Sequence, residues 1–168
     1  MDMNKYNEWP ANHKGDKNPS PKIIALGKRI TDVAGHMIGG VTVEDPEYWG
    51  LAPICTDEQA NIALKMGVRK PKTLKQMVQI TGMDEKELEK QLEQMSFNGL
   101  LEYNWENPQH EKQYVLPMFV PGSAEFTNMN STVLEEHPEM GRFFERMSRL
   151  PLEKITPCLL YTSPSPRD

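Results

Sequence analysis

A run of basic residues lies in the middle of the chain. No acidic residue interrupts it, and its members are Lys65, Arg69, Lys70, Lys72 and Lys75. Cationic groups at this density can bind an acidic protein surface, or the phosphates of a nucleotide held elsewhere in a larger protein. The pattern is equally typical of a solvated helix end followed by a loop, because cations are stabilised near a helix C-terminus. We retain the run as a candidate docking patch.

Residue types that perform nucleophilic or acid–base catalysis are present but scattered. Cys55 precedes a helix cap, where the positive end of the helix could activate its thiol. A small buried apolar side chain is the simpler interpretation of this cysteine. The four histidines are far apart in sequence, belong to no catalytic motif and are interpreted as structural or solvent-facing: His13, His36, His110 and His137. The sequence therefore predicts no catalytic residue.

Cofactor-binding motifs are also missing from the sequence. Neither Gly-x-x-x-x-Gly-Lys nor Gly-x-Gly-x-x-Gly occurs, and two cysteines, Cys55 and Cys158, cannot supply the four ligands of a zinc site or a four-iron cluster. The net charge of -5 over 168 residues argues against general nucleic-acid binding, and no apolar run reaches the length of about 18 residues that spans a bilayer. We predict no cofactor or metal ligand in this chain, no membrane association and a cytoplasmic location.

The last eleven residues, 158–168, follow no pattern that continues the preceding sequence. They resemble the translated sequencing-adapter read-through found at the ends of many metagenomic reading frames. We interpret residues 158–168 as an artefact tail and expect the natural sequence to continue differently beyond Pro157. A disordered Ser/Pro-rich terminus is the alternative interpretation. Either way, we exclude the tail from the fold.

Helix starts are marked by four caps. Ser20 followed by Pro21 predicts a helix up to about Ala34. Three capping-box patterns then predict helices stopped by Gly67, Gly82 and Asn98-Gly99, because a side-chain oxygen and a Glu or Gln three residues later satisfy free backbone N–H groups reciprocally. The three pairs are Thr56 with Gln59, Thr73 with Gln76, and Asp84 with Glu87.

A hairpin is predicted after the third of these helices. Residues 100–105 alternate in polarity, 106–108 form a turn, and 113–116 read as a returning strand. This order of elements is typical of a winged helix-turn-helix: a helix, a short helix, a glycine turn, a longer helix and a hairpin. The predicted fold is therefore mainly α with a small β-hairpin, and a winged-helix-like domain occupies residues 56–117.

Three further segments complete the predicted organisation. Residues 1–19 form an irregular arm, and residues 20–55 form a helix and a Gly-rich loop. Residues 118–157 form a surface connector up to about Asn130 and then an amphipathic helix that begins around Pro138 and leads to a missing redox core. The apolar face of that helix must pack against something and is a candidate packing face: Met140, Phe143, Phe144, Met147 and Leu150.

The longest helix of the predicted winged-helix block is acidic. Between Asp84 and Glu93 there are five acids and two bases, which sum to a charge of -3. In a DNA major groove these carboxylates would face phosphates, opposing the counterion release that drives such binding. The sequence thus argues against a nucleic-acid partner for this helix.

The chain resembles the N-terminal region of a known enzyme family. The resemblance rests on the arm, on Ile30-Thr-Asp-Val-Ala-Gly-His-Met-Ile-Gly-Gly40, on the winged-helix block and on Arg149-Leu-Pro-Leu-Glu-Lys-Ile-Thr-Pro157. The family comprises clostridial FAD-dependent pyridine nucleotide-disulfide oxidoreductases with ferredoxin-type [4Fe-4S] modules. It is similar to the beta subunit of the NADPH-Fe(3+) oxidoreductase and to glutamate-synthase small-subunit-like flavoproteins.

This resemblance implies a parent oxidoreductase that passes electrons from NAD(P)H through FAD and [4Fe-4S] centres, all held downstream of this chain. It implies that residues 1–157 are a non-catalytic leader that docks on the redox domains or on a partner subunit and is inactive alone. Two alternatives from other classes remain open: a winged-helix transcriptional regulator that binds DNA, and an interaction module that dimerises through Phe143, Phe144 and Met147.

Overall fold

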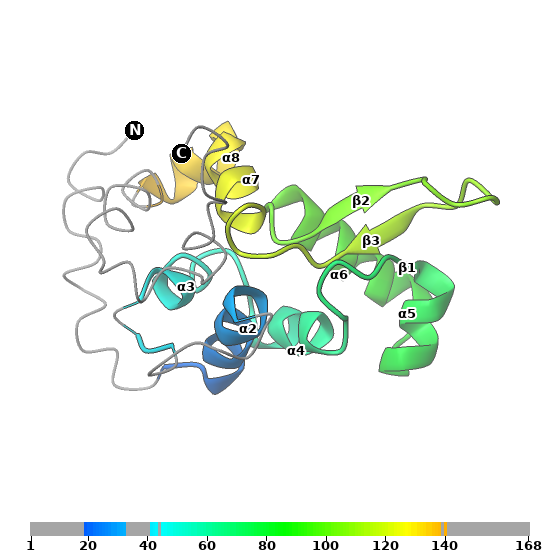
Figure 1. The fold of residues 1–168 in the computed structure, drawn as a ribbon, viewed down its shortest axis with the longest axis horizontal. Coiled ribbons are helices and arrows are strands. Elements are labelled where there is room, and N and C mark those ends of the chain that lie inside the picture. The colour runs from blue at the N-terminus through cyan, green and yellow to red at the C-terminus, as the bar shows by residue number, and fades with distance from the viewer. Residues whose placement is uncertain (1–18, 33–40, 44, 139, 141–168) are drawn as a thin grey trace, which may run out of the picture.

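The computed structural model of the 168-residue chain describes residues 19–32, 41–43, 45–138 and 140. About half of these residues are helical, and a small three-stranded antiparallel sheet accompanies the helices (Figure 1). The described part is thus a mixed α and β structure. Its elements are α2 (Pro21–Thr31), α3 (Pro46–Trp49), α4 (Asp57–Leu64), β1 (Lys72–Thr73), α5 (Leu74–Thr81), α6 (Glu85–Phe97), β2 (Glu102–Asn104), β3 (Gln113–Val115), α7 (Ser123–Met129) and α8 (Ser131–Glu136).

All four predicted caps begin helices. The Ser20 hydroxyl accepts a hydrogen bond from the Ile23 N–H at the start of α2. Complete capping boxes begin α4 and α5. At α6 the cap is one-sided: Asp84 accepts from two backbone N–H groups, whereas the Glu87 carboxylate accepts from the Gln91 side chain.

Helix ends follow the predicted signals less uniformly. Gly82 ends α5 in the left-handed conformation with φ 73°, and Gly99 follows α6 with φ 84°. Helix α2 ends at Thr31, before the predicted Ala34, because Asp32 has left the helical conformation (φ -95°, ψ 59°). Local signals therefore place helix starts more reliably than this helix end.

The sheet contains one strand that the sequence did not predict. Its order is β1-β3-β2, with Tyr114 of β3 opposite both Lys72 of β1 and Tyr103 of β2. The predicted hairpin is therefore confirmed, and β1 adds a third strand on its far side. In Figure 1 the β2–β3 hairpin extends away from the helices.

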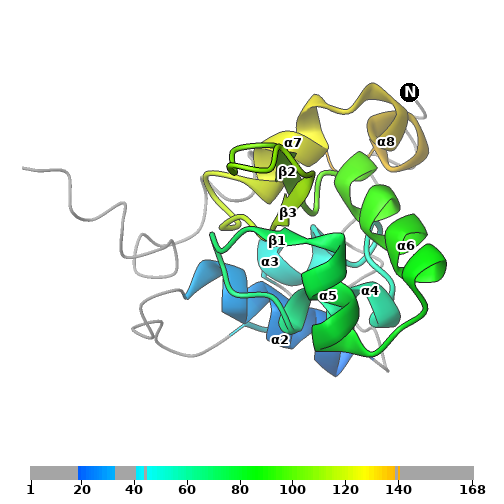
Figure 2. The same ribbon diagram turned by 90° about the vertical axis from the view of Figure 1, so that its right-hand side faces the viewer.

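One hydrophobic core joins the helices to the sheet. Helix α2 packs on α3 and α4, and α5 packs on α6. Figure 2 shows α6 along one side of the sheet, with α7 and α8 at the top of the view. Fully buried side chains come from five of these elements: Leu26, Ile30, Ile62, Met77, Leu88, Leu92, Met95 and Tyr114.

The prediction of a surface connector between Pro117 and Asn130 holds for Phe126, which is exposed, but is wrong for the backbone and for Phe119. Helix α7 forms there, and α8 follows at once. Phe119, expected on the surface, is buried, and its backbone N–H donates to the Ile30 carbonyl at 3.0 Å. Within the segment predicted as a Gly-rich loop, the short α3 forms and buries Trp49. Both errors have one cause: these segments are ordered by contacts with distant residues.

Several predictions concern residues outside the described ranges. They include the arm before Pro19, the loop at 33–40, the tail at 158–168, and Phe143, Phe144, Met147 and Leu150 of the candidate packing face. Met140, the described member of that face, is buried. In the part of the chain that is described, no helix has the length and apolarity needed to cross a membrane.

Candidate docking site

The candidate docking patch extends from the end of α4 to the first turn of α5. Three of its five cations form ion pairs or hydrogen bonds within the chain. Arg69 forms an ion pair of 2.9 Å with Glu102, and Lys75 lies 3.6 Å from Glu111. The Lys65 ammonium donates to the Thr81 carbonyl. Within the described ranges, Lys70 and Lys72 form no ion pair or side-chain hydrogen bond. The patch therefore offers two uncommitted cations, fewer than its sequence suggests.

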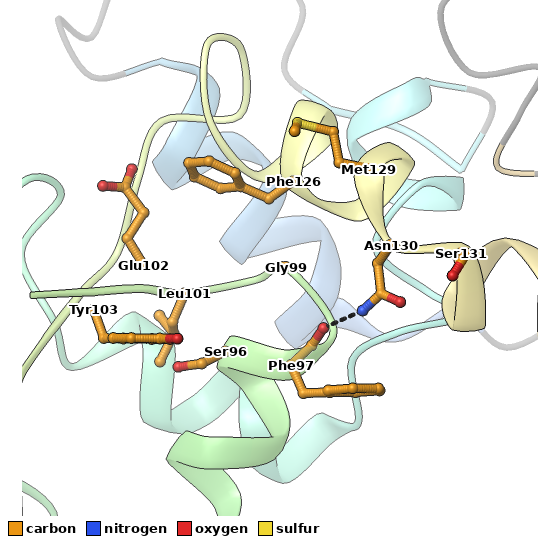
Figure 3. Close-up of a pocket in the computed structure, with 10 residues that line it drawn as sticks. All are labelled: Ser96, Phe97, Gly99, Leu101, Glu102, Tyr103, Phe126, Met129, Asn130 and Ser131. Atoms are coloured by element: carbon orange, nitrogen blue, oxygen red, sulfur yellow. Dashed lines mark hydrogen bonds between the residues drawn. The ribbon is translucent and has the colours of Figure 1, made fainter.

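A groove that the sequence analysis missed adjoins the docking patch at Glu102, the ion-pair partner of Arg69. It has a volume of about 600 Å³ and is formed where the end of α6, strand β2 and the α7–α8 corner meet (Figure 3). We call it the aromatic groove, and its lining residues are Ser96, Phe97, Gly99, Leu101, Glu102, Tyr103, Phe126, Met129, Asn130 and Ser131.

Large apolar side chains are unusually exposed in this groove. Phe97 is 55% exposed, Tyr103 50%, Phe126 39% and Met129 82%. Scattered exposed apolar residues are normal, whereas several that converge on one hollow are typical of a binding surface. Only two other large apolar side chains in the described residues are comparably exposed, Ile80 and Trp105.

Hydrogen bonds between distant segments fix the walls of the aromatic groove. The Asn130 side-chain amide donates to the Phe97 carbonyl at 2.5 Å (Figure 3). The Thr127 hydroxyl shares its one proton between the Asn98 carbonyl at 3.2 Å and the Ser123 carbonyl of its own helix at 2.8 Å. Gly99 allows this approach, because a Cβ atom there would lie 2.6 Å from the Thr127 nitrogen. The end of α6 and helix α7 are thus held together as one unit.

The segments that form the walls of the aromatic groove are acidic, and two of their carboxylates are paired with bases from neighbouring segments. The segments that form its walls, 91–104 and 122–136, contain no Lys or Arg. They contain five acids, namely Glu93, Glu102, Glu125, Glu135 and Glu136. Glu102, which lines the groove, forms an ion pair with Arg69, and Glu93 forms one with Lys112, so two of these five charges are compensated.

A cluster beside the groove attaches the hairpin to α6. Glu93 accepts hydrogen bonds from the Lys112 ammonium at 2.6 Å and from the Tyr114 hydroxyl at 2.5 Å. Burial raises the pKa of Glu93, but these two hydrogen bonds and the Lys112 charge outweigh it, so the pKa lies below its usual value. The Lys112 ammonium also lies 4.4 Å from the centre of the Tyr103 ring, and Tyr103 meets Trp105 edge to face at 5.5 Å.

The residues considered for catalysis are placed apart from one another. Cys55 is buried, and burial, followed by the nearby Asp57 charge, raises the pKa of its thiol to about 12. The thiol is therefore protonated and inert at neutral pH, as the simpler interpretation predicted. His110 lies in the exposed β2–β3 turn, and His137 follows α8. Among the described residues, no group of three or more His, Cys, Asp or Glu side chains is arranged to hold a metal ion.

Comparisons with known proteins supply no relative for this chain. No protein-family model matches it, and neither the curated proteins nor the solved structures give a match.

Sequence reasoning missed the aromatic groove because its walls come from two separate stretches of chain, 96–103 and 126–131. One local signal was present: Phe126 and Met129 are spaced as i and i+3, and Asn130 follows them as a helix cap. Recognising that pattern would have indicated α7 and α8. Their position against α6 and β2 depends on tertiary contacts that no local pattern contains.

Proposed function

We propose that this chain is a non-catalytic docking domain of winged-helix type. The topology supports the winged-helix assignment, since the elements follow the order α4, β1, α5, α6, β2 and β3 with the sheet order β1-β3-β2. Helix α6 occupies the place of the helix that reads DNA in such domains. Its N-terminal half exposes Glu85, Glu87 and Glu89, so its surface favours a protein partner over a nucleic acid.

The observation that carries the docking role is the aromatic groove. Four of the six exposed large apolar side chains in the described residues line it. Leaving them in water costs about 25 cal/mol for each Å² of apolar surface, and a bound partner would recover that cost. The hydrogen bonds from α7 and Asn130 to the end of α6 hold the groove in shape before a partner binds.

The proposed partner is the redox portion of a larger iron–sulfur flavoprotein, or a partner subunit of that enzyme. This part of the proposal rests on the sequence resemblance of residues 1–157 to the leader region of FAD-dependent oxidoreductases with [4Fe-4S] modules. Electrons would pass from NAD(P)H through FAD and the clusters in the parent enzyme. The chain described here would supply binding surface and no redox group.

Two measurements on the purified 168-residue chain test this proposal. After reconstitution with FAD, iron and sulfide, the chain should show no stoichiometric flavin or iron–sulfur absorbance. When it is mixed with the downstream redox polypeptide, obtained by following the uninterrupted genomic reading frame beyond Pro157, it should form a complex of defined stoichiometry. A stoichiometric chromophore on the chain alone, or no complex at micromolar concentrations, would overturn the proposal.

A DNA-binding regulator is the second candidate, and the same topology is the observation that favours it. Lys70 and Lys72 would then contact phosphates, since they are the uncommitted cations of the docking patch. Binding to duplex DNA that falls steeply with salt and weakens when both lysines are neutralised would support this function over the first.

A further inference from the structure

One asparagine–glycine pair occurs in the sequence, and it lies at the end of α6: Asn98 and Gly99. An asparagine before a glycine is prone to deamidation, because glycine has no Cβ atom to keep its backbone nitrogen away from the asparagine side chain. The Gly99 nitrogen attacks the Asn98 Cγ atom, ammonia leaves, and a cyclic imide forms. Water then opens the imide at either carbonyl. The net reaction consumes one water, releases one ammonia and leaves aspartate or isoaspartate in place of the asparagine.

The fold directs both reacting groups away from each other. Asn98 is the C-cap of α6 with φ -74° and ψ -6°, and the Gly99 N–H donates to the Ser96 carbonyl at 3.2 Å. The Asn98 Oδ1 atom accepts from the Gln94 side-chain amide at 3.1 Å, while its Nδ2 atom donates to the Ile54 carbonyl at 3.0 Å. The side chain is therefore held at both ends. Closing the imide ring requires that these side-chain hydrogen bonds and the bond from Gly99 break.

Neighbouring segments also limit the movement that would release the pair. Gly99 is buried at the base of the aromatic groove (Figure 3), and an added Cβ atom there would lie 2.6 Å from the Thr127 nitrogen. The Asn98 carbonyl accepts from the Thr127 hydroxyl at 3.2 Å. The pair is thus in contact with α7 through its backbone and with the segment before α4 through the Asn98 side chain. Release needs the end of α6 to separate from its neighbours.

Neither product of deamidation can rebuild this cap. A carboxylate has no N–H group to donate to the Ile54 carbonyl, and negative charge is unfavourable at the C-terminus of a helix. An isoaspartate also adds one carbon to the backbone next to Gly99, where α7 leaves no room even for a Cβ atom. Conversion should therefore weaken the contact of α6 with both neighbours, including the base of the aromatic groove.

We propose that Asn98 is a latent deamidation site that the native fold protects. Water converts it to aspartate or isoaspartate when the end of α6 separates from α7 and from the segment before α4, and the altered residue then keeps that end of the helix loosened. This inference is independent of the proposed docking function, because it rests only on contacts within the chain.

Peptide mapping by mass spectrometry tests the protection on the full chain. The chain is incubated at mildly alkaline pH with and without enough urea to unfold it. Asn98 should convert at least about ten-fold more slowly in the folded chain, because only the opened fraction of molecules can react. A synthetic peptide of residues 94–103, incubated with and without urea, corrects for the effect of urea on the chemistry. Equal corrected rates in the folded and unfolded chains would overturn the inference.

A variant that releases the side chain tests which contacts protect it. Gln94→Ala removes the hydrogen bond to the Asn98 Oδ1 atom at an exposed position of α6, so the folded variant should deamidate at least about two-fold faster than the wild type. Lys90→Ala is the matched control, because Lys90 is exposed on the same helix and forms no ion pair or hydrogen bond with the described residues. Circular dichroism shows that each variant is folded. Equal rates in the two variants would overturn the protective role of the side-chain hydrogen bonds.

The consequence of conversion has its own test, since Asn98→Asp reproduces one product. This variant should lower the thermal midpoint by at least about 2 °C, because the bond to the Ile54 carbonyl is lost. Asn104→Asp is the matched control: the Asn104 Oδ1 atom accepts from the Glu106 N–H at 3.0 Å, and a carboxylate accepts that bond equally well. A thermal midpoint of Asn98→Asp as high as that of the control would overturn the claim that conversion loosens the end of α6.

Discussion

The hydroxyl of Tyr114 donates a 2.5 Å hydrogen bond to the carboxylate of Glu93 and so joins strand β3 to helix α6. The Lys112 ammonium donates to the same carboxylate oxygen at 2.6 Å. Because β2 pairs with β3, this junction also holds β2 in place as one wall of the aromatic groove. The hydrogen bond between Tyr114 of β3 and Glu93 therefore contributes to the geometry of the proposed binding surface, although β3 does not line the groove.

Removing the hydroxyl of Tyr114 should destabilise the fold moderately. We expect Tyr114→Phe to lower the free energy of unfolding by about 1 kcal/mol at pH 7, since Glu93 keeps its bond to Lys112. Urea denaturation measures the change. Tyr103→Phe is the control, because the Tyr103 hydroxyl forms no hydrogen bond with the described residues. An equal decrease in the free energy of unfolding of Tyr103→Phe would contradict a specific role of the Tyr114 hydrogen bond.

The same tyrosine predicts a change of stability at alkaline pH. Burial raises the pKa of Tyr114 above its ordinary value of 10.0, and the hydrogen bond to Glu93 and the Glu93 charge raise it further. A raised pKa in the folded state stabilises the fold below pH 10 and loses that contribution as the pH rises further. The difference in stability between the wild type and Tyr114→Phe should therefore shrink above pH 10. A difference that stays constant to pH 11 would contradict this prediction.

Glu93 predicts the opposite dependence at acidic pH. Its folded-state pKa lies below the ordinary value of 4.5, so its contribution is present above pH 4.5 and is lost as the pH falls below that value. Glu93→Gln should be less stable than the wild type at pH 7 by up to about 1 kcal/mol, because the side chain is 47% exposed. The two proteins should converge on acidification. Glu135→Gln, at an exposed position of α8, is the control and should match the wild type in stability at pH 7.

Gly99 tests the contact that closes the base of the aromatic groove. It has φ 84°, and an added Cβ would lie 2.6 Å from the Thr127 nitrogen. We expect Gly99→Ala to cost about 2–3 kcal/mol, from backbone strain together with displacement of α7. Gly82→Ala is a matched control, since Gly82 has φ 73° but no atom within 4 Å of the added carbon. It should cost only about 1 kcal/mol. Equal costs would mean that α7 does not pack closely on Gly99.

The parts of the fold that the sequence predicted are those governed by neighbouring residues. Thr56 with Gln59 and Thr73 with Gln76 place helix starts because both partners lie within one turn. The hairpin followed from alternation and a turn. Strand β1 has two residues, and only its pairing with Gln113 and Tyr114 makes it a strand. Phe119 shows the same limit, because it is buried and its backbone N–H bonds to the carbonyl of Ile30, which is distant in sequence.

The candidate site divides in the same way. The docking patch was visible as a charge run, but its ion pairs with Glu102 and Glu111 depend on the sheet and were not predictable locally. The aromatic groove was not visible at all, since Phe97 and Phe126 lie in segments whose positions are set by side-chain bonds to backbone carbonyls. Charge sign was the reliable local quantity, because the acidity of α6 is read directly from its own residues.

Helix α6 should prevent binding to duplex DNA. We expect the chain to bind a short fluorescent duplex with a Kd above about 10⁻⁴ M at physiological salt. This affinity is lower than that of ordinary non-specific DNA binding. The cause is the carboxylates on the surface that would enter the major groove. A double variant, Glu85→Lys with Glu89→Lys, changes two exposed side chains on that surface and should gain salt-dependent binding.

The gain in the double variant would show that charge, and not the shape of the domain, decides the partner. Tight, salt-dependent binding by the wild-type chain would contradict the prediction. If Lys70→Gln with Lys72→Gln then abolished it, the docking patch would be a phosphate-binding surface and the regulator function would replace the docking function. If the folded Glu85→Lys, Glu89→Lys variant did not bind DNA, α6 would not be the helix that faces DNA. The winged-helix topology would then say nothing about which partner the chain binds.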